Sequence, residues 1–102
     1  MPPFLTIDEA RAKLGEKEFS SEELFEMHEK RIDECDPQLN AFLTRTPYEE
    51  ESAGPLHGIP GAIKDVLLTR GVKTTASSKI LETYIPPYDA TVVAKFKNAG
   101  YS

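Results

Sequence analysis

The sequence predicts an α/β fold in which helices pack on an incomplete mixed sheet. Two N-terminal segments carry helix-start signals, two short apolar runs lack a helical period, and a third helical pattern lies near the C-terminus. The predicted order is therefore helix, helix, strand, strand, helix. We expect a single domain over residues 1–102, with the N-terminal helices in 1–38 and a strand–loop–helix part in 39–102.

The first helix is predicted over residues 7–14. Thr6 and Glu9 have the spacing of a capping box, in which hydroxyl and carboxylate each accept a hydrogen bond from an otherwise unpaired backbone amide. Gly15 follows as a helix stop.

The second helix is predicted to begin after Ser20, because Ser20 and Glu23 repeat the capping-box spacing. We expect it to end near residue 34, since Asp36-Pro37 disfavours helix at that point. Apolar residues at helical spacing form its inward stripe, which comprises Leu24, Phe25, His28, Ile32 and Cys35.

Two strands are predicted over residues 39–44 and 57–65, joined by a polar, acidic surface connection. The second does not alternate cleanly, which is typical of a strand buried on both faces. Gly61 in its middle indicates that another group approaches the backbone closely there.

The remaining chain is predicted to contain a Thr- and Ser-rich loop over 69–78, a helical turn within 79–84 and a last helix over 90–98. Asp89 is the expected N-cap of that helix.

The composition indicates a globular chain of 102 residues, 39% hydrophobic and 28% charged. A net charge of -5 argues against a nucleic-acid surface, which is usually basic. The single cysteine, Cys35, excludes an internal disulfide. No apolar run is long enough to span a membrane and no signal peptide is evident, so we expect a cytoplasmic protein, or an organellar one in a eukaryote.

Lys64 is the first candidate for chemistry, because it stands at the end of a strand predicted to be buried. A partly desolvated lysine can serve as a base, whereas a strand that reaches the surface also commonly ends in a solvated lysine. The residues alone leave both interpretations open. Ser77 and Ser78 could act as nucleophiles or could bind loop and helix-start amides; the S-x-x-K spacing of serine–lysine enzymes is absent.

No metal or phosphate site is predicted. His28 and His57 have no cysteine or carboxylate at ligand spacing, and neither glycine-rich phosphate-binding motif occurs. No cofactor is therefore expected in this chain.

The stretch from residue 54 to residue 100 resembles the amidase signature family. "GIPGAIKD", "TRGVKTTASSKIL" and "YIPPYDATVVAKFKNAG" follow one another in the order and spacing of that family, most specifically of the glutaminase subunits of glutamyl-tRNA(Gln) amidotransferases. "SSEELFEMHEKRIDECDPQLNAFLT" is also similar to its second helix and the strand that follows. The resemblance implies that residues 1–102 form the N-terminal portion of an amidase-signature fold, as one partial amidase domain.

The resemblance also implies a Ser–cis-Ser–Lys triad in which Lys64 is the catalytic lysine. Glutamine would be the substrate and would form an acyl-enzyme, and the released ammonia would convert Glu-tRNA(Gln) to Gln-tRNA(Gln). The amidotransferase subunits B and C are the implied partners. The first of these two would use ATP and Mg²⁺, and tRNA would be met only through the complex.

Two departures from the family accompany the match. The connection from Arg45 to Ala53 is short, and Gly61 stands where the family generally has a bulkier residue. Both triad serines belong to a later part of the family's sequence, so we expect this chain alone to lack glutaminase activity. The alternative is a non-catalytic interaction module, derived from an amidase, that docks on a partner protein.

Overall fold

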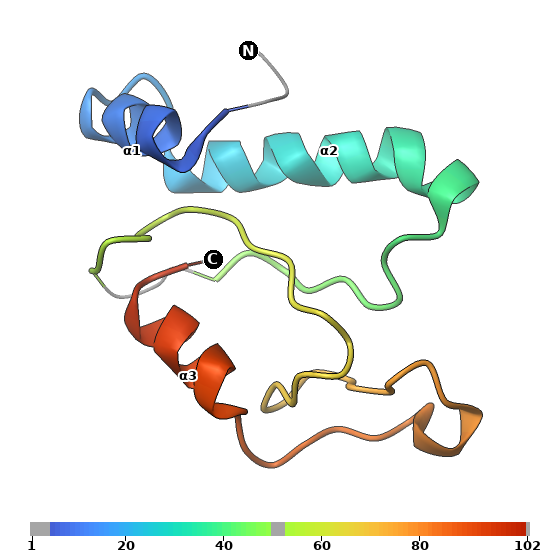
Figure 1. The fold of residues 1–102 in the computed structure, drawn as a ribbon. Helices are drawn as coiled ribbons and strands as arrows, with labels where there is room; N and C mark the ends of the chain where they lie inside the picture. Colours follow the sequence, from blue (N-terminus) through green and yellow to red (C-terminus); the bar gives the residue numbers. More distant parts are fainter. Residues whose placement is uncertain (1–4, 50–52, 102) are drawn as a thin grey trace.

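The computed structural model describes residues 5–49 and 53–101 (Figure 1). Within these ranges the chain forms helix α1 (Ile7–Gly15), helix α2 (Ser21–Leu39), the 3₁₀ turn η1 (Lys79–Leu81) and helix α3 (Thr91–Asn98). The predicted helices are thus confirmed. No strand occurs in the described residues, so the predicted mixed sheet is not formed in this part of the chain.

The capping residues at the start of α1 and α2 act as the sequence predicts. Thr6 Oγ1 accepts a hydrogen bond from the Glu9 amide at 3.1 Å. Ser20 and Glu23 form the complete capping box, with the Glu23 amide 3.1 Å from Ser20 Oγ and the Ser20 amide 3.3 Å from Glu23 Oε1. Both helices therefore begin where side-chain oxygens replace the missing intrahelical acceptors.

The expected end of α2 near residue 34 is wrong, because the helix passes through Pro37 and continues to Leu39. A proline so close to the C-terminus removes only one amide from the helical ladder. Asn40 then adopts the left-handed conformation, with φ 51°, and ends the helix. The Asp36 carboxylate accepts the amides of Ala41 and Phe42 at 2.6 and 3.2 Å.

The predicted strands 39–44 and 57–65 are wrong as hydrogen-bonded elements. Residues 40–49 follow α2 as irregular backbone, and residues 59–64 run as an open segment after a turn over 55–58. A strand is defined by a ladder with a neighbouring strand, and the described residues offer these segments none. Apolar sequence alone therefore did not make a sheet.

The connection after α2 lies on the surface, as predicted, and is held against the helix. Arg45 forms ion pairs with Glu29 and Asp33, the second at 2.6 Å. Tyr48 hydrogen-bonds Ser21 through their hydroxyls at 2.6 Å. Residues 50–52 of this connection lie outside the described residues.

The core is small and lies between α1 and the first turns of α2. Ala10, Phe19 and Leu24 are buried together. Partly buried apolar residues pack against them: Leu5, Leu14, Met27 and Ile59. His28, predicted on the inward stripe, is exposed instead. Val93 of α3 is fully buried but does not belong to this cluster.

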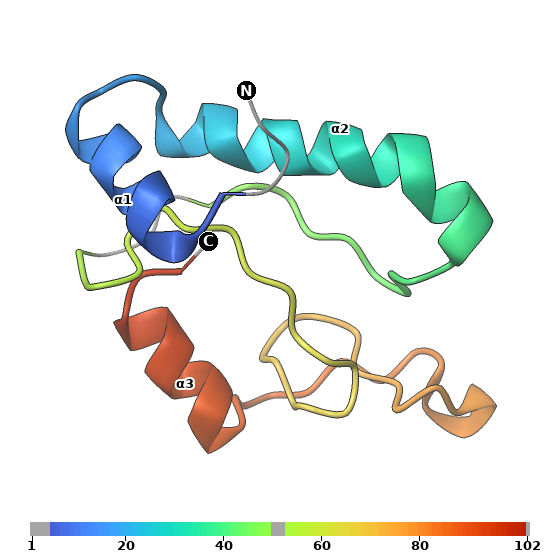
Figure 2. The same ribbon diagram turned by 45° about the horizontal axis from the view of Figure 1, so that its top comes forward.

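The chain exposes more surface than a compact protein of its size. Its accessible surface is 7299 Å², whereas a compact monomer of 11.4 kDa is expected to expose about 5,800 Å². Figures 1 and 2 show why: α2 and α3 lie on opposite sides of the open segment, and the arm that carries η1 extends away from both. None of the helices in the described residues has the length and apolar character needed to cross a bilayer.

Because the core is so small, single buried residues should carry much of the stability. We predict that Leu24→Ala, at a side chain only 1% exposed, lowers the free energy of unfolding by about 2–5 kcal/mol. Ile80→Ala, at a side chain 93% exposed, is the matched control and should change it by less than about 0.5 kcal/mol. Urea denaturation followed by circular dichroism measures both; equal losses would contradict this view of the core.

Candidate active site

Lys64 lies at the end of the open segment 59–64, immediately before a turn. Its side chain is exposed and makes no hydrogen bond or ion pair with the described residues. The Lys64 carbonyl accepts the amide of Leu67 at 3.0 Å, which closes the turn over residues 64–67. The ammonium group is therefore available while the backbone that carries it is held.

The backbone of this segment has unused hydrogen-bonding groups. The amides of residues 61–64 donate to no described residue, and Pro60 has no amide hydrogen to donate. By contrast, the amides of Leu56 and Gly58, just before the segment, donate to the carbonyls of Ala99 and Gly100 at 2.7 and 3.1 Å. The segment is thus fixed at its start and unpaired along its length.

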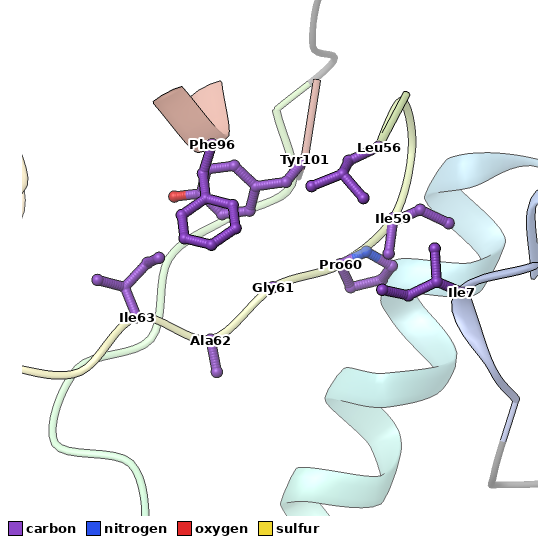
Figure 3. Close-up of a pocket in the computed structure, with 9 residues that line it drawn as sticks. All are labelled: Ile7, Leu56, Ile59, Pro60, Gly61, Ala62, Ile63, Phe96 and Tyr101. Carbon is purple, nitrogen blue, oxygen red and sulfur yellow. The ribbon is translucent and has the colours of Figure 1, made fainter. Parts of the chain in front are cut away.

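An apolar pocket of about 160 Å³ lies beside the segment (Figure 3). Its walls come from α1, the open segment and the C-terminal end of α3 with the residue that follows. The lining residues are Ile7, Leu56, Ile59, Pro60, Gly61, Ala62, Ile63, Phe96 and Tyr101. The side chain of Ile63, next to Lys64, is directed toward Phe96.

Gly61 is the point of closest approach, as its position in the sequence indicates. A Cβ atom built there would lie 2.6 Å from Cδ2 of Tyr101, so any larger residue would require the ring to move. The Tyr101 ring meets Phe96 edge-on, with centroids 6.0 Å apart. Glycine at position 61 therefore allows the chain after α3 to lie against the segment that leads to Lys64.

Asp65 connects this segment to the loop at residues 75–77. Its Oδ1 accepts the Thr75 amide at 2.9 Å, and its Oδ2 accepts the Thr75 hydroxyl and, at 3.4 Å, the Ser77 amide. Its backbone carbonyl also accepts the Ala76 amide, at 3.1 Å. The hydrogen bond from the Thr75 hydroxyl holds the pKa of the Asp65 carboxyl below its ordinary value; the two amides act in the same direction and partial burial in the opposite one.

The loop that receives Asp65 has an unusual backbone. Ala76 and Ser77 have φ values of 49° and 57°, in the left-handed region that costs a non-glycine residue about 1 kcal/mol or more. This conformation directs successive amides toward one carboxylate. Ser78 Oγ accepts the Ile80 amide at 3.3 Å and caps η1. Ser77 and Ser78 thus take part in loop and helix-start contacts, the structural interpretation of the two.

Asp89 holds the far end of the loop, not the start of α3. Its predicted role as N-cap is wrong, because Ala90 occupies the cap position and no side chain caps the helix. The Asp89 carboxylate instead accepts the Arg70 amide at 2.8 Å and pairs with Lys97 at 3.0 Å. The Arg70 amide, followed by Lys97, lowers the pKa of Asp89, against partial burial.

Thr74 completes the support of the loop. It is buried, its hydroxyl accepts the Thr69 amide at 3.3 Å, and its own amide donates to the Tyr84 carbonyl at 3.1 Å. Sequence reasoning missed Asp65, Thr74 and Asp89 as a group. The available signal was weak: threonine and aspartate spaced along a loop commonly bind backbone amides.

The described residues include no group of three or more His, Cys, Asp or Glu side chains that could hold a metal ion. The possible chemistry at this place is therefore that of an accessible amine next to an apolar pocket.

Comparison with known proteins identifies relatives for almost the whole chain. The family described as Amidase matches residues 23–102. The A subunit of glutamyl-tRNA(Gln) amidotransferase from Halothermothrix orenii is 49% identical over 102 residues, which are 94% of this chain and 21% of that protein. Its namesake in Geobacter metallireducens is 44% identical over 109 residues, covering 94% and 22%.

A solved structure gives the same result. The crystal structure of the A subunit of glutamyl-tRNA(Gln) amidotransferase from Thermotoga maritima matches with a TM-score of 0.81 and 41% identity, over 96% of this chain and 21% of that one. The chain spans about a fifth of the length of the relatives it matches.

The Asp65 contacts predict a pH dependence. The folded-state pKa of Asp65 is below the unfolded value, so its hydrogen bonds stabilise the fold above the ordinary pKa of about 3.9. This contribution disappears as the pH falls through the lowered folded-state pKa. We predict that Asp65→Asn weakens the dependence of the urea midpoint on pH in this acidic range. An unchanged dependence in the variant would contradict the assignment.

Proposed function

This chain belongs to the amidase family, and from that we propose that it is the N-terminal segment of a glutamine-hydrolysing amidase subunit with Lys64 as its catalytic lysine. The observation that carries the proposal is the placement of Lys64. Its flanking backbone is held, its amine has no partner among the described residues, and an apolar pocket lies beside the segment that leads to it.

The proposed role of Lys64 is proton transfer. The nucleophilic serine loses its proton to a bridging serine, which passes its own proton to the Lys64 amine. The serine oxygen attacks the side-chain amide of glutamine and forms the acyl-enzyme. The proton then returns to the departing nitrogen, which leaves as ammonia, and water hydrolyses the ester to glutamate.

Both serines are proposed to lie in the part of the relatives that this chain does not match. The same part would supply the surroundings of Lys64. A neutral amine requires removal from water, and Lys64 is exposed here, so residues outside this chain must cover it.

The same reasoning extends to the fold. We propose that residues 59–64 are a strand whose neighbours belong to the rest of the amidase domain. The amides of residues 61–64 are unpaired here, and a pairing strand would satisfy them. The α/β sheet expected from the sequence would then form only in the complete domain.

The partners proposed from the relatives are the two other amidotransferase subunits, B and C, with tRNA met only through the complex. The residues described here do not fit ATP or Mg²⁺, since they include no acidic cluster for a metal ion and the sequence contains no glycine-rich phosphate loop. That chemistry is left to the B partner.

A hybrid protein tests the role of Lys64. This chain replaces the matching N-terminal fifth of the Thermotoga maritima protein, and glutaminase activity of the hybrid is measured. We predict that Lys64→Met lowers kcat by about 10²–10⁴-fold, whereas Lys79→Met, at another exposed lysine, leaves it unchanged.

The chain of 102 residues alone should release no ammonia from glutamine above background. Full activity of the Lys64→Met hybrid would overturn the proposal and favour a non-catalytic interaction module. Glutaminase activity of the chain alone would contradict the assignment of both serines to another segment.

A further inference from the structure

We infer that Asp65 is a positioning residue that sets the direction of the Lys64 side chain by fastening the adjoining backbone to residues 75–77. The inference rests on the catalytic role proposed for Lys64, and it adds a residue whose effect on the reaction would be exerted through that lysine.

The first support is the number of contacts made by one residue. Asp65 uses both carboxylate oxygens and its backbone carbonyl to accept hydrogen bonds from Thr75, Ala76 and Ser77. The Thr75 hydroxyl also accepts the Ser77 amide at 3.2 Å, so the receiving loop is itself cross-linked. The peptide that follows Lys64 is therefore held through main chain and side chain together.

The second support is the pattern of exposure around Lys64. Ile63 and Asp65 are half-buried, whereas Lys64 between them is exposed. Ile63 is directed into the apolar pocket, and Asp65 is bound to the loop. Because the two neighbours are fixed to separate parts of the molecule, rotation of the backbone at Lys64 is restricted from both sides.

The third support is that the Asp65 carboxylate has no cationic partner among the described residues. A carboxylate next to a lysine in sequence could pair with it and occupy the amine. Here the donors of Thr75 and Ser77 occupy the carboxylate instead. The contacts that orient Lys64 thus also leave its amine unpaired.

The test measures the orientation of Lys64 in the chain itself. Residual dipolar couplings of the Ile63, Lys64 and Asp65 amides, with the ¹³Cε shift of Lys64, are recorded for the wild type, Asp65→Asn, Thr75→Val and Thr75→Ser. We expect Asp65→Asn and Thr75→Val to reduce the couplings and shift the ¹³Cε signal. Thr75→Ser keeps the hydroxyl and should restore both.

Asp36→Asn is the matched control, because Asp36 also accepts two backbone amides but lies at the end of α2. It should leave the Lys64 signals unchanged. If Asp65→Asn perturbs the whole chain, Thr75→Val against Thr75→Ser still decides. Wild-type signals for Lys64 in both Asp65→Asn and Thr75→Val would overturn the inference.

A kinetic readout separates this inference from the proposed function. In the hybrid protein, Asp65→Asn should lower kcat by about 100-fold with little change in KM, since a small misplacement of a reacting group has an effect of this size. If Lys64→Met keeps full activity, the proposed function fails whatever Asp65 does. If Lys64→Met is inactive and Asp65→Asn is not impaired, only the positioning role fails.

Discussion

The backbone amides around Lys64 need hydrogen-bond acceptors, and the described residues contain no sheet to supply them. Side chains and turns take over this role: Asp65 binds the loop at 75–77, Thr74 binds Thr69, and Asp89 binds Arg70. A buried backbone group without a partner is costly, so these contacts are what allows residues 64–90 to keep one shape. The region is ordered by carboxylates and hydroxyls, while the two apolar clusters lie elsewhere.

This organisation explains why a chain with few buried residues still has a defined site. The buried cluster of Ala10, Phe19 and Leu24 holds the N-terminal helices, and Ile59 packs against it at the start of the open segment. From there the backbone passes the pocket and reaches Lys64, with Asp65 tied to the next loop. The site thus lies between an apolar anchor and a polar one. The unpaired amides of residues 61–64 are the part that neither anchor satisfies.

The sequence predicted what local contacts determine. Thr6 and Ser20 mark the starts of α1 and α2 because a cap is formed within three residues, and Gly61 indicated the close approach that Tyr101 makes. Strands were predicted wrongly because a ladder depends on a distant neighbour, which apolar pattern cannot reveal. Pro37 was taken as a stop although the last turn of a helix tolerates the loss of an amide. The residues alone could not decide the role of Lys64, and the motifs shared with amidases led to the catalytic interpretation.

The most direct test is amide hydrogen exchange at residues 61–64, measured in the chain alone and in the hybrid with the rest of the Thermotoga maritima protein. We predict rapid exchange of these amides in the chain alone, with slower exchange at Leu56 and Gly58, whose amides are bonded. In the hybrid, all four amides should become strongly protected as neighbouring strands pair with them. Equal exchange of residues 61–64 in the two proteins would contradict the claim that this segment is an amidase strand that pairs only in the complete domain.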